Sequence, residues 1–115
     1  IYNAAALAGE LRARGHRFRG HSDTEVLLAA VDEWGLAATV PRLNGIFAFA
    51  LWDRRDRTLH LVRDHLGVKP LYYGWVGDSL VFGSELKALV RFPGFAASID
   101  RGALALFLRH NCVPA

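Results

Sequence analysis

Apolar side chains recur along the first third of the chain at the spacing that keeps one face of a helix buried. The pattern predicts a helix over residues 4–14, with Asn3 as its N-cap and Gly15 at its end. It predicts a second helix over residues 24–34, with Asp32 and Glu33 facing outward. The expected buried positions are Leu7 and Leu11 in the first helix, and Val26, Leu27, Ala30, Val31 and Trp34 in the second.

Short apolar runs separated by turn residues replace this spacing after residue 45, as is typical of strands. Residues 46–52 are apolar on both faces, which predicts a strand buried from both sides in the middle of a layered sheet. The charged tip 53–57 predicts a hairpin to a partner strand over residues 58–62. A second hairpin is predicted between residues 71–73 and 80–82, around the turn dipeptide Gly77-Asp78.

Shorter elements complete the predicted order. Residues 16–20 alternate as in a short strand with Phe18 inward, and a short helix up to Leu43 is broken by Pro41 before a turn at residues 44–45. A helix is predicted over residues 84–90, and a final one is capped by Asp100. Helices, then antiparallel strands, then helices predict an α+β fold in which helical layers cover the sheets.

The composition describes a globular domain or a part of one. The 115 residues are 52% hydrophobic and 22% charged, enough to build a core. The chain starts at Ile1 rather than Met and ends without a polar tail, so we expect both ends to continue in a longer polypeptide. Its single cysteine, Cys112, allows no internal disulfide and fits a reducing compartment, so we expect a cytoplasmic protein. No signal peptide or spanning segment is visible, and no membrane partner is expected.

The formal charge of +3 does not by itself indicate nucleic acid, because the arginines are scattered over separate elements without interleaved aromatic residues. We therefore expect no nucleic-acid partner. No Gly-rich phosphate loop follows a predicted strand. We also expect no metal site, because the histidines never pair at the spacing of helical ligands; they are His16, His21, His60, His65 and His110.

Asp23 is the main candidate for a binding residue. Ser22 and Glu25 have the spacing of a capping box, in which the serine hydroxyl accepts from the Glu25 N–H and the glutamate reaches back to the Ser22 N–H. That motif does not require an acid at position 23, although the helix dipole favours one. A carboxylate at a junction between strand and helix is also well suited to bind the ammonium group of a substrate. The local pattern permits both the structural and the binding interpretation.

Two other clusters are weaker candidates for a catalytic or binding site. Cys112 next to His110 and Asn111 contains the residue types of a cysteine-protease triad, but side chains so close in sequence do not converge. We interpret Cys112 as a small, partly buried thiol. The charged segment 63–70, with Asp64 and Lys69, could form an active-site loop, but we favour an ion-paired connection between neighbouring elements.

Six sequence blocks, in order along nearly the whole chain, resemble the glutamine amidotransferase domain of glutamine-hydrolysing asparagine synthetases, the class II amidotransferase family. The blocks are Ile1-Tyr2-Asn3, Gly15-His16-x-Phe18, Ser22-Asp23-Thr24-Glu25-Val26, residues 43–53 (Leu-Asn-Gly-Ile-Phe-Ala-Phe-Ala-Leu-Trp-Asp), residues 63–73 (Arg-Asp-His-Leu-Gly-Val-Lys-Pro-Leu-Tyr-Tyr) and Ser84-Glu85-Leu86-Lys87-Ala88-Leu89. Single blocks are weak signals, but six in register make a specific match.

The resemblance implies an N-terminal-nucleophile hydrolase fold, with two antiparallel sheets between helical layers. In that family an N-terminal cysteine attacks the side-chain amide of glutamine, with its own α-amino group as the base. It also implies that Asp23 binds the α-ammonium group of glutamine. The cysteine and the oxyanion donors correspond to positions before Ile1, so no catalytic residue is assigned here and the excerpt alone should be inactive. Cys112 has no free α-amino group and cannot replace the nucleophile.

The resemblance also implies partners outside this stretch. Residues 1–99 correspond to the distal part of the amidotransferase domain, and residues 100–115 to the start of a linker toward a synthetase domain. Ammonia from glutamine would pass to that domain, where magnesium-ATP activates aspartate, and we expect no cofactor within residues 1–115. Ile46 is hypothesised to line the apolar ammonia route.

Several points stay open at the level of sequence. The oligomeric state is undetermined, a homodimer included. Related enzymes carry the same front domain with a sugar or a peptide as the acceptor. A non-catalytic interaction module on the same fold, in which Asp23 only caps a helix, is the alternative of a different class.

Overall fold

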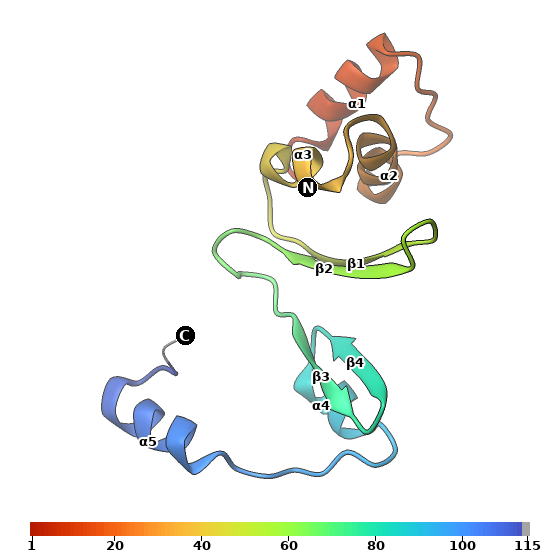
Figure 1. Cartoon of the computed structure of the whole chain (residues 1–115). Coiled ribbons are helices and arrows are strands. Elements are labelled where there is room, and N and C mark those ends of the chain that lie inside the picture. The colour runs from red at the N-terminus through yellow and green to blue at the C-terminus, as the bar shows by residue number, and fades with distance from the viewer. Residues whose placement is uncertain (114–115) are drawn as a thin grey trace. The chain divides into compact units, whose positions relative to one another are not determined.

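The computed structural model of the chain describes residues 1–113 (Figure 1). It forms two compact units, unit 1 over Ile1–Leu71 and unit 2 over Tyr72–Ala115. Each unit contains a two-stranded antiparallel sheet together with helices, which confirms the predicted α+β class. The expected linker over residues 100–115 extends two residues beyond the described part of the chain and stays a prediction.

The helices of unit 1 are α1 (Ala4–Ala13), α2 (Asp23–Trp34), α3 (Leu36–Thr39) and the single 3₁₀ turn η1 (Val40–Arg42). They gather on one side of the hairpin in Figure 1. The bounds of α1 and α2 agree with the helical spacing of the sequence to within one residue. The short helix before residue 43 is confirmed as well, and its end tightens into the 3₁₀ turn at the predicted proline.

The core of unit 1 lies where the two helical stripes meet. The predicted positions Leu7 and Leu11 of α1 are buried, whereas Val31 and Trp34 of α2 are only partly buried against the core. Apolar burial on this scale is the main favourable term for a small unit. The buried cluster consists of Leu7, Ala8, Leu11, Val26, Leu27, Ala30, Leu43 and Phe47.

A polar side chain fixes the corner between α2 and α3. Thr39 is fully buried, and its hydroxyl lies 2.9 Å from the carbonyl oxygen of Ala30 and 2.8 Å from that of Gly35. A buried hydroxyl without partners costs free energy, and these carbonyl groups satisfy it. Helical spacing alone does not identify this residue, because its partners lie on α2 and at the glycine that follows it.

Strands β1 (Ala48–Asp53) and β2 (Thr58–Arg63) form the predicted hairpin, in a register that runs from Ala48 opposite Arg63 to Asp53 opposite Thr58. At the tip, the Asp53 carboxylate accepts from the backbone N–H groups of Arg55 and Asp56 at 2.7 and 3.2 Å. This Asx-type turn satisfies the backbone where the chain reverses.

The prediction that residues 46–52 form a strand buried from both sides is wrong for the described structure. The sheet has two strands, with Phe49 packed against the core and Trp52, which points to the opposite face, 54% exposed. An apolar run shows which residues tolerate burial, but the number of covered faces depends on what packs against the sheet.

The strand predicted over residues 16–20 is absent, since no strand is assigned before β1 in the described chain. The backbone N–H groups of Arg19 and Gly20 instead donate to the Glu25 carboxylate at 2.8 and 3.0 Å. The reciprocal capping box is therefore wrong in detail. Ser22 caps α2 by accepting from the Thr24 N–H at 3.2 Å, while Glu25 reaches further back along the chain.

Unit 2 contains the second predicted hairpin, formed by β3 (Tyr72–Val76) and β4 (Ser79–Gly83), with Gly77 at φ +57° in its turn. Helix α4 (Leu86–Val90) contacts β4. Helix α5 (Arg101–His110) is capped, as predicted, by Asp100, whose carboxylate accepts from the N–H groups of Gly102 and Ala103. None of the residues of α5 is buried.

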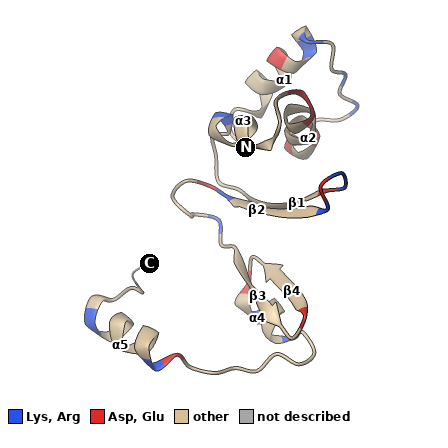
Figure 2. Ribbon diagram, viewed as in Figure 1, with Lys and Arg blue, Asp and Glu red and all other residues tan. Residues whose placement is uncertain are grey.

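Two properties of the described residues bear on partners. None of the helices in residues 1–113 has the length and apolar content needed to cross a bilayer. Figure 2 shows basic residues on separate segments, mixed with acidic ones at the β1–β2 tip. Basic residues scattered over separate segments do not by themselves indicate nucleic-acid binding.

Candidate functional site

A cleft of about 250 Å³ opens in unit 1 between the first turn of α2 and the segment that leads into β1. Asp23 and Ile46 both line it, although they lie on different segments. Ile1, Phe47 and Lys69 contribute to the wall as well. The structure thus brings the predicted binding residue and the residue of the hypothesised ammonia route to one cleft.

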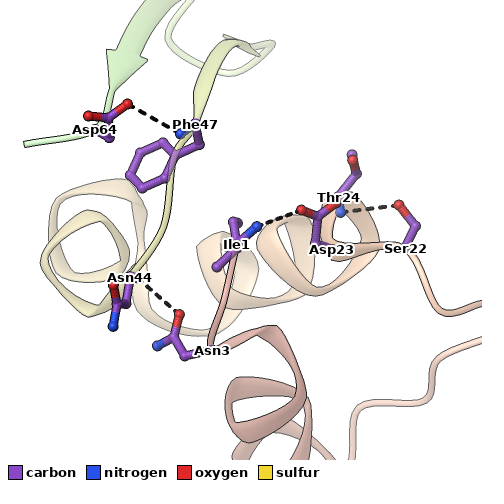
Figure 3. A network of polar contacts seen from close by, with 8 residues as sticks. All are labelled: Ile1, Asn3, Ser22, Asp23, Thr24, Asn44, Phe47 and Asp64. Atoms are coloured by element: carbon purple, nitrogen blue, oxygen red, sulfur yellow. Dashed lines mark hydrogen bonds and ion pairs between the residues drawn. The ribbon is translucent and has the colours of Figure 1, made fainter. Parts of the chain in front are cut away.

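Asp23 occupies the first position of α2, directly after the Ser22 cap. Its side chain is 50% exposed, and its Oδ2 accepts a hydrogen bond from the α-ammonium group of Ile1 at 2.9 Å (Figure 3). A carboxylate in this position is accessible from the cleft. Its Oδ2 atom can therefore accept a hydrogen bond from a donor in the cleft.

The hydrogen bond and the positive charge of the Ile1 ammonium group lower the pKa of Asp23, and the backbone N–H groups of Thr24 and of Asp23 itself add to the effect. Desolvation opposes the shift without reversing it. The carboxylate is therefore charged at neutral pH. Its location in the first turn of the helix favours that charge as well.

The N-terminal segment is held beside the cleft by hydrogen bonds to the loop before β1. The Asn3 side chain donates to the Arg42 carbonyl oxygen at 2.8 Å. It also accepts from the Asn44 N–H at 2.9 Å (Figure 3). The Tyr2 N–H donates to the Asn44 carbonyl oxygen at 2.7 Å. The prediction of Asn3 as a side-chain cap of α1 is wrong, because its amide group bonds this distant loop instead.

Gly45 allows the close approach of these two segments. A Cβ atom at this position would lie 3.1 Å from both the Ile1 Cα and the Tyr2 nitrogen, and its φ of +152° is rare for residues with a side chain. The turn predicted at residues 44–45 therefore has a tertiary role, since it seats the first residues of the chain against the segment that carries Ile46 and leads into β1.

Asp64 is the buried carboxylate of unit 1, with 5% of its surface exposed. Its two oxygens accept from the N–H groups of Phe47 at 3.3 Å, Val68 at 2.7 Å and Lys69 at 2.8 Å. Its own N–H donates to the Phe47 carbonyl oxygen at 2.9 Å. Figure 3 shows the contact with Phe47, which ties the chain after β2 to the residue before β1.

The ion-paired connection predicted for residues 63–70 is therefore wrong for Asp64. Within the described residues this carboxylate takes part in no salt bridge, and backbone N–H groups satisfy it instead. These bonds, with that from Lys69 the largest contribution, lower the pKa of Asp64. The charges of the loop were evident from the sequence, but the binding of backbone N–H groups by Asp64 was not. An aspartate opening a short loop with Gly67 and Pro70 was the available signal.

The remaining candidates lie elsewhere. Cys112 is exposed, so the prediction of a partly buried thiol is wrong; it follows α5, which buries none of its own residues. Within residues 1–113, no three His, Cys, Asp or Glu side chains come close enough to hold a metal ion.

Ile46 is 47% exposed at the cleft, and its part in an ammonia route stays a prediction.

Comparison with known proteins gives a consistent result. The glutamine amidotransferase domain family matches residues 1–115. The chain is 50% identical over 105 residues, 91% of its length, to asparagine synthetase (glutamine-hydrolyzing) 3 of Bacillus subtilis. It is 40% identical over 114 residues, 99% of its length, to asparagine synthetase (glutamine-hydrolyzing) 1 of the same organism. Over 90 residues, 77% of its length, it is 46% identical to asparagine synthetase (glutamine-hydrolyzing) 3 of Arabidopsis thaliana.

The chain spans only a minor part of these relatives, namely 17%, 18% and 15% of their lengths. The similarity nevertheless covers most or all of the chain itself, and the family match includes the α2 segment with Asp23 and the loop with Asp64. Because the family match extends over all 115 residues, the chain belongs to the glutamine amidotransferase domain family.

Proposed function

We propose that the full-length protein containing this chain hydrolyses glutamine to glutamate and passes the ammonia to an ATP-dependent synthetase domain that forms an amide on aspartate. The names of the relatives support both halves of this activity. In this proposal residues 1–115 supply part of the glutamine site, and Asp23 binds the α-ammonium group of the substrate.

The observation that carries the proposal is the Asp23 carboxylate, which is half exposed, lines the cleft and lies in the first turn of α2. Glutamine carries an α-ammonium group. A charged carboxylate gives such a group a charge-assisted hydrogen bond, which is stronger than a neutral one. Fixing the α-ammonium group at one end of the cleft orients the rest of the substrate, and orientation supplies a large share of catalysis.

The remaining parts of the mechanism follow from the family resemblance and belong to the proposal. The nucleophile is an N-terminal cysteine activated by its own α-amino group, on an N-terminal-nucleophile hydrolase fold. The synthetase domain binds magnesium-ATP, and residues 100–115 begin the connection to it. The residues described here bind and orient glutamine and border the path of ammonia, with Ile46 at the cleft.

The test is Asp23→Asn in the full-length protein. Because Asp23 is half exposed, we expect the loss of one charge-assisted bond rather than of a buried ion pair, about 10-fold or somewhat more in kcat/KM for glutamine. The loss should come mainly from a higher KM. Asp32→Asn, on the exposed side of the same helix, is the matched control and should leave KM unchanged.

The outcomes separate the alternatives. An effect of Asp23→Asn confined to thermal stability would contradict the glutaminase proposal and favour a non-catalytic interaction module. If the protein hydrolyses glutamine but forms no asparagine from aspartate, the proposed glutamine site is retained and aspartate is rejected as the acceptor. Sugar and peptide acceptors are then assayed in the same reaction by the transfer of nitrogen from glutamine.

A further inference from the structure

Two segments far apart in sequence form neighbouring parts of the Asp23 cleft. Phe47 comes directly before β1, and Lys69 lies in the loop after β2. The backbone N–H groups of both residues donate to the same oxygen of Asp64, Oδ2, at 3.3 and 2.8 Å. One buried carboxylate thus sets the distance between these two parts of the wall.

We propose that Asp64 is a positioning residue for glutamine binding: it does not touch the substrate, but it holds the backbone of Phe47 and Lys69 in the arrangement that forms the Asp23 cleft. This inference rests on the proposed glutaminase function. It gives the segment 63–70 a specific role in the site.

The chemistry of the contacts requires a carboxylate. An ionised carboxylate is an acceptor only, and its two oxygens can accept the three N–H groups that converge here. An asparagine of the same shape has one acceptor oxygen, and its NH₂ group would face at least one backbone N–H. A buried donor left without an acceptor shifts or opens the loop. Asp64→Asn should therefore move the cleft wall without removing a large side chain.

A second carboxylate in the same hairpin provides the matched comparison. Asp53 also accepts from backbone N–H groups, those of Arg55 and Asp56, but at the opposite end of the hairpin. Asp53 and its two partners do not line the Asp23 cleft. The two aspartates share the same chemistry in the same sheet and differ in whether their partners belong to the cleft.

The experiment compares Asp64→Asn with Asp53→Asn in the full-length protein, with Asp23→Asn as a third variant. Steady-state kinetics are measured with glutamine as the nitrogen source, and again with ammonia supplied directly. We expect Asp64→Asn to raise KM for glutamine about fivefold or more, because misplaced binding groups weaken catalysis, and to leave the ammonia-dependent rate unchanged. Asp53→Asn should leave KM for glutamine unchanged.

The results separate this inference from the function on which it rests. If Asp23→Asn raises KM for glutamine but Asp64→Asn does not, the positioning role is rejected and the glutaminase function stands. If Asp23→Asn has no effect on KM, the proposed function itself fails. If Asp53→Asn raises KM as much as Asp64→Asn, the effect is a general loss of hairpin stability and the positioning role is rejected.

Hydrogen exchange in the unmodified protein keeps the inference testable if Asp64→Asn does not fold. Glutamine, kept in saturating excess because the protein hydrolyses it, should slow exchange of the Phe47 and Lys69 amides, because the substrate stabilises the wall that they form. The Arg55 and Asp56 amides, held by Asp53, serve as the internal control and should exchange at the same rate with and without glutamine. Equal rates for the Phe47 and Lys69 amides in both states would reject the positioning role.

Discussion

Unit 1 and unit 2 have the same kinds of elements and very different interiors. Unit 1 contains a cluster of eight buried apolar residues, drawn from both long helices and the segment before β1. Within the described part of unit 2, a single apolar residue, Leu89, is buried, and many large apolar side chains are exposed. In both units the hairpins and capped helices follow their local sequence signals.

The difference shows that secondary structure and tertiary stability have separate causes in this chain. Turn glycines and cap residues specify an element through neighbours a few positions away, with or without a core. Stability of the whole unit requires apolar area removed from water. Unit 1 meets this requirement and contains the Asp23 cleft, so its packing should determine the geometry of the site.

The largest difference in stability between matched variants of the two units should come from truncating apolar side chains. Leu11 is fully buried, so Leu11→Ala leaves a cavity and should lower the free energy of unfolding by about 2–5 kcal/mol. Leu108→Ala, at a side chain of α5 that is 73% exposed, should change it by less than about 0.5 kcal/mol. Urea denaturation of the 115-residue chain measures both. Equal losses would mean that α5 packs in a core.

Acid should destabilise unit 1 through Asp64. Because the folded-state pKa of this carboxyl group is lowered from the usual 3.8, its contribution is present above pH 3.8 and is lost as the pH falls through the lower folded value. We expect a smaller loss than for Leu11→Ala. The measurement is the midpoint of unfolding of α2, followed by NMR from neutral to acid pH.

Asp64→Asn isolates the contribution of this group, since an amide does not titrate. The variant should be less stable than the wild type at neutral pH, and the difference in their free energies of unfolding should become smaller in acid. The other carboxyl groups with lowered pKa, among them Asp23, keep some acid dependence in both proteins. A difference in stability that stays constant from neutral to acid pH would contradict a role for the Asp64 charge.

Glycine substitutions test the close approach beside the cleft. Gly45→Ala places a methyl group 3.1 Å from the Ile1 Cα in a backbone conformation that side chains rarely adopt, so we expect a loss of about 1–3 kcal/mol. Gly74→Ala in β3 meets no atom within 4 Å and should stay within about 0.5 kcal/mol of the wild type. Thermal unfolding of both variants makes the comparison, and a neutral Gly45→Ala would show that the N-terminal segment moves freely.

Removing the helix caps should have the smallest effects on stability, and the effects of the two caps should differ. Ser22→Ala removes the cap of α2, whose buried face belongs to the core, and should cost unit 1 about 1 kcal/mol. Asp100→Ala should speed amide exchange at Gly102 and Ala103 and leave the unfolding of unit 1 unchanged. If Asp100→Ala lowered the stability of unit 1 as much as Ser22→Ala, the separation of the two units would be wrong.

Predictions from the sequence were accurate where neighbours within a few residues decide the structure. Both hairpins, the two long helices of unit 1, the break at Pro41 and the Asp100 cap were all predicted and are present. The predictions failed where a polar side chain had a choice of partners. Asn3 and Glu25 bond backbone groups other than those that local motifs suggested, and Asp64 accepts from backbone N–H groups where ion pairing was predicted.

The candidate site could be predicted only in part from the sequence. Asp23 stood out through its place at a helix start and through the resemblance, but the role of Asp64 depends on contacts with Phe47, 17 positions away in the sequence. Apolar spacing also could not tell how many faces of β1 are covered. A strand with two apolar faces has the same sequence whether one layer or two packs against it.

The sequence by itself determined the helices and hairpins, because their caps, turns and apolar spacing act locally, and its six blocks were sufficient to indicate the family. The tertiary structure alone decided which polar groups meet: the Asn3 amide on the loop before β1, and the Asp64 carboxylate on the cleft wall. A buried or constrained polar group takes the partners that packing brings within reach, and those partners are set by the whole unit rather than by the residues next to it in sequence.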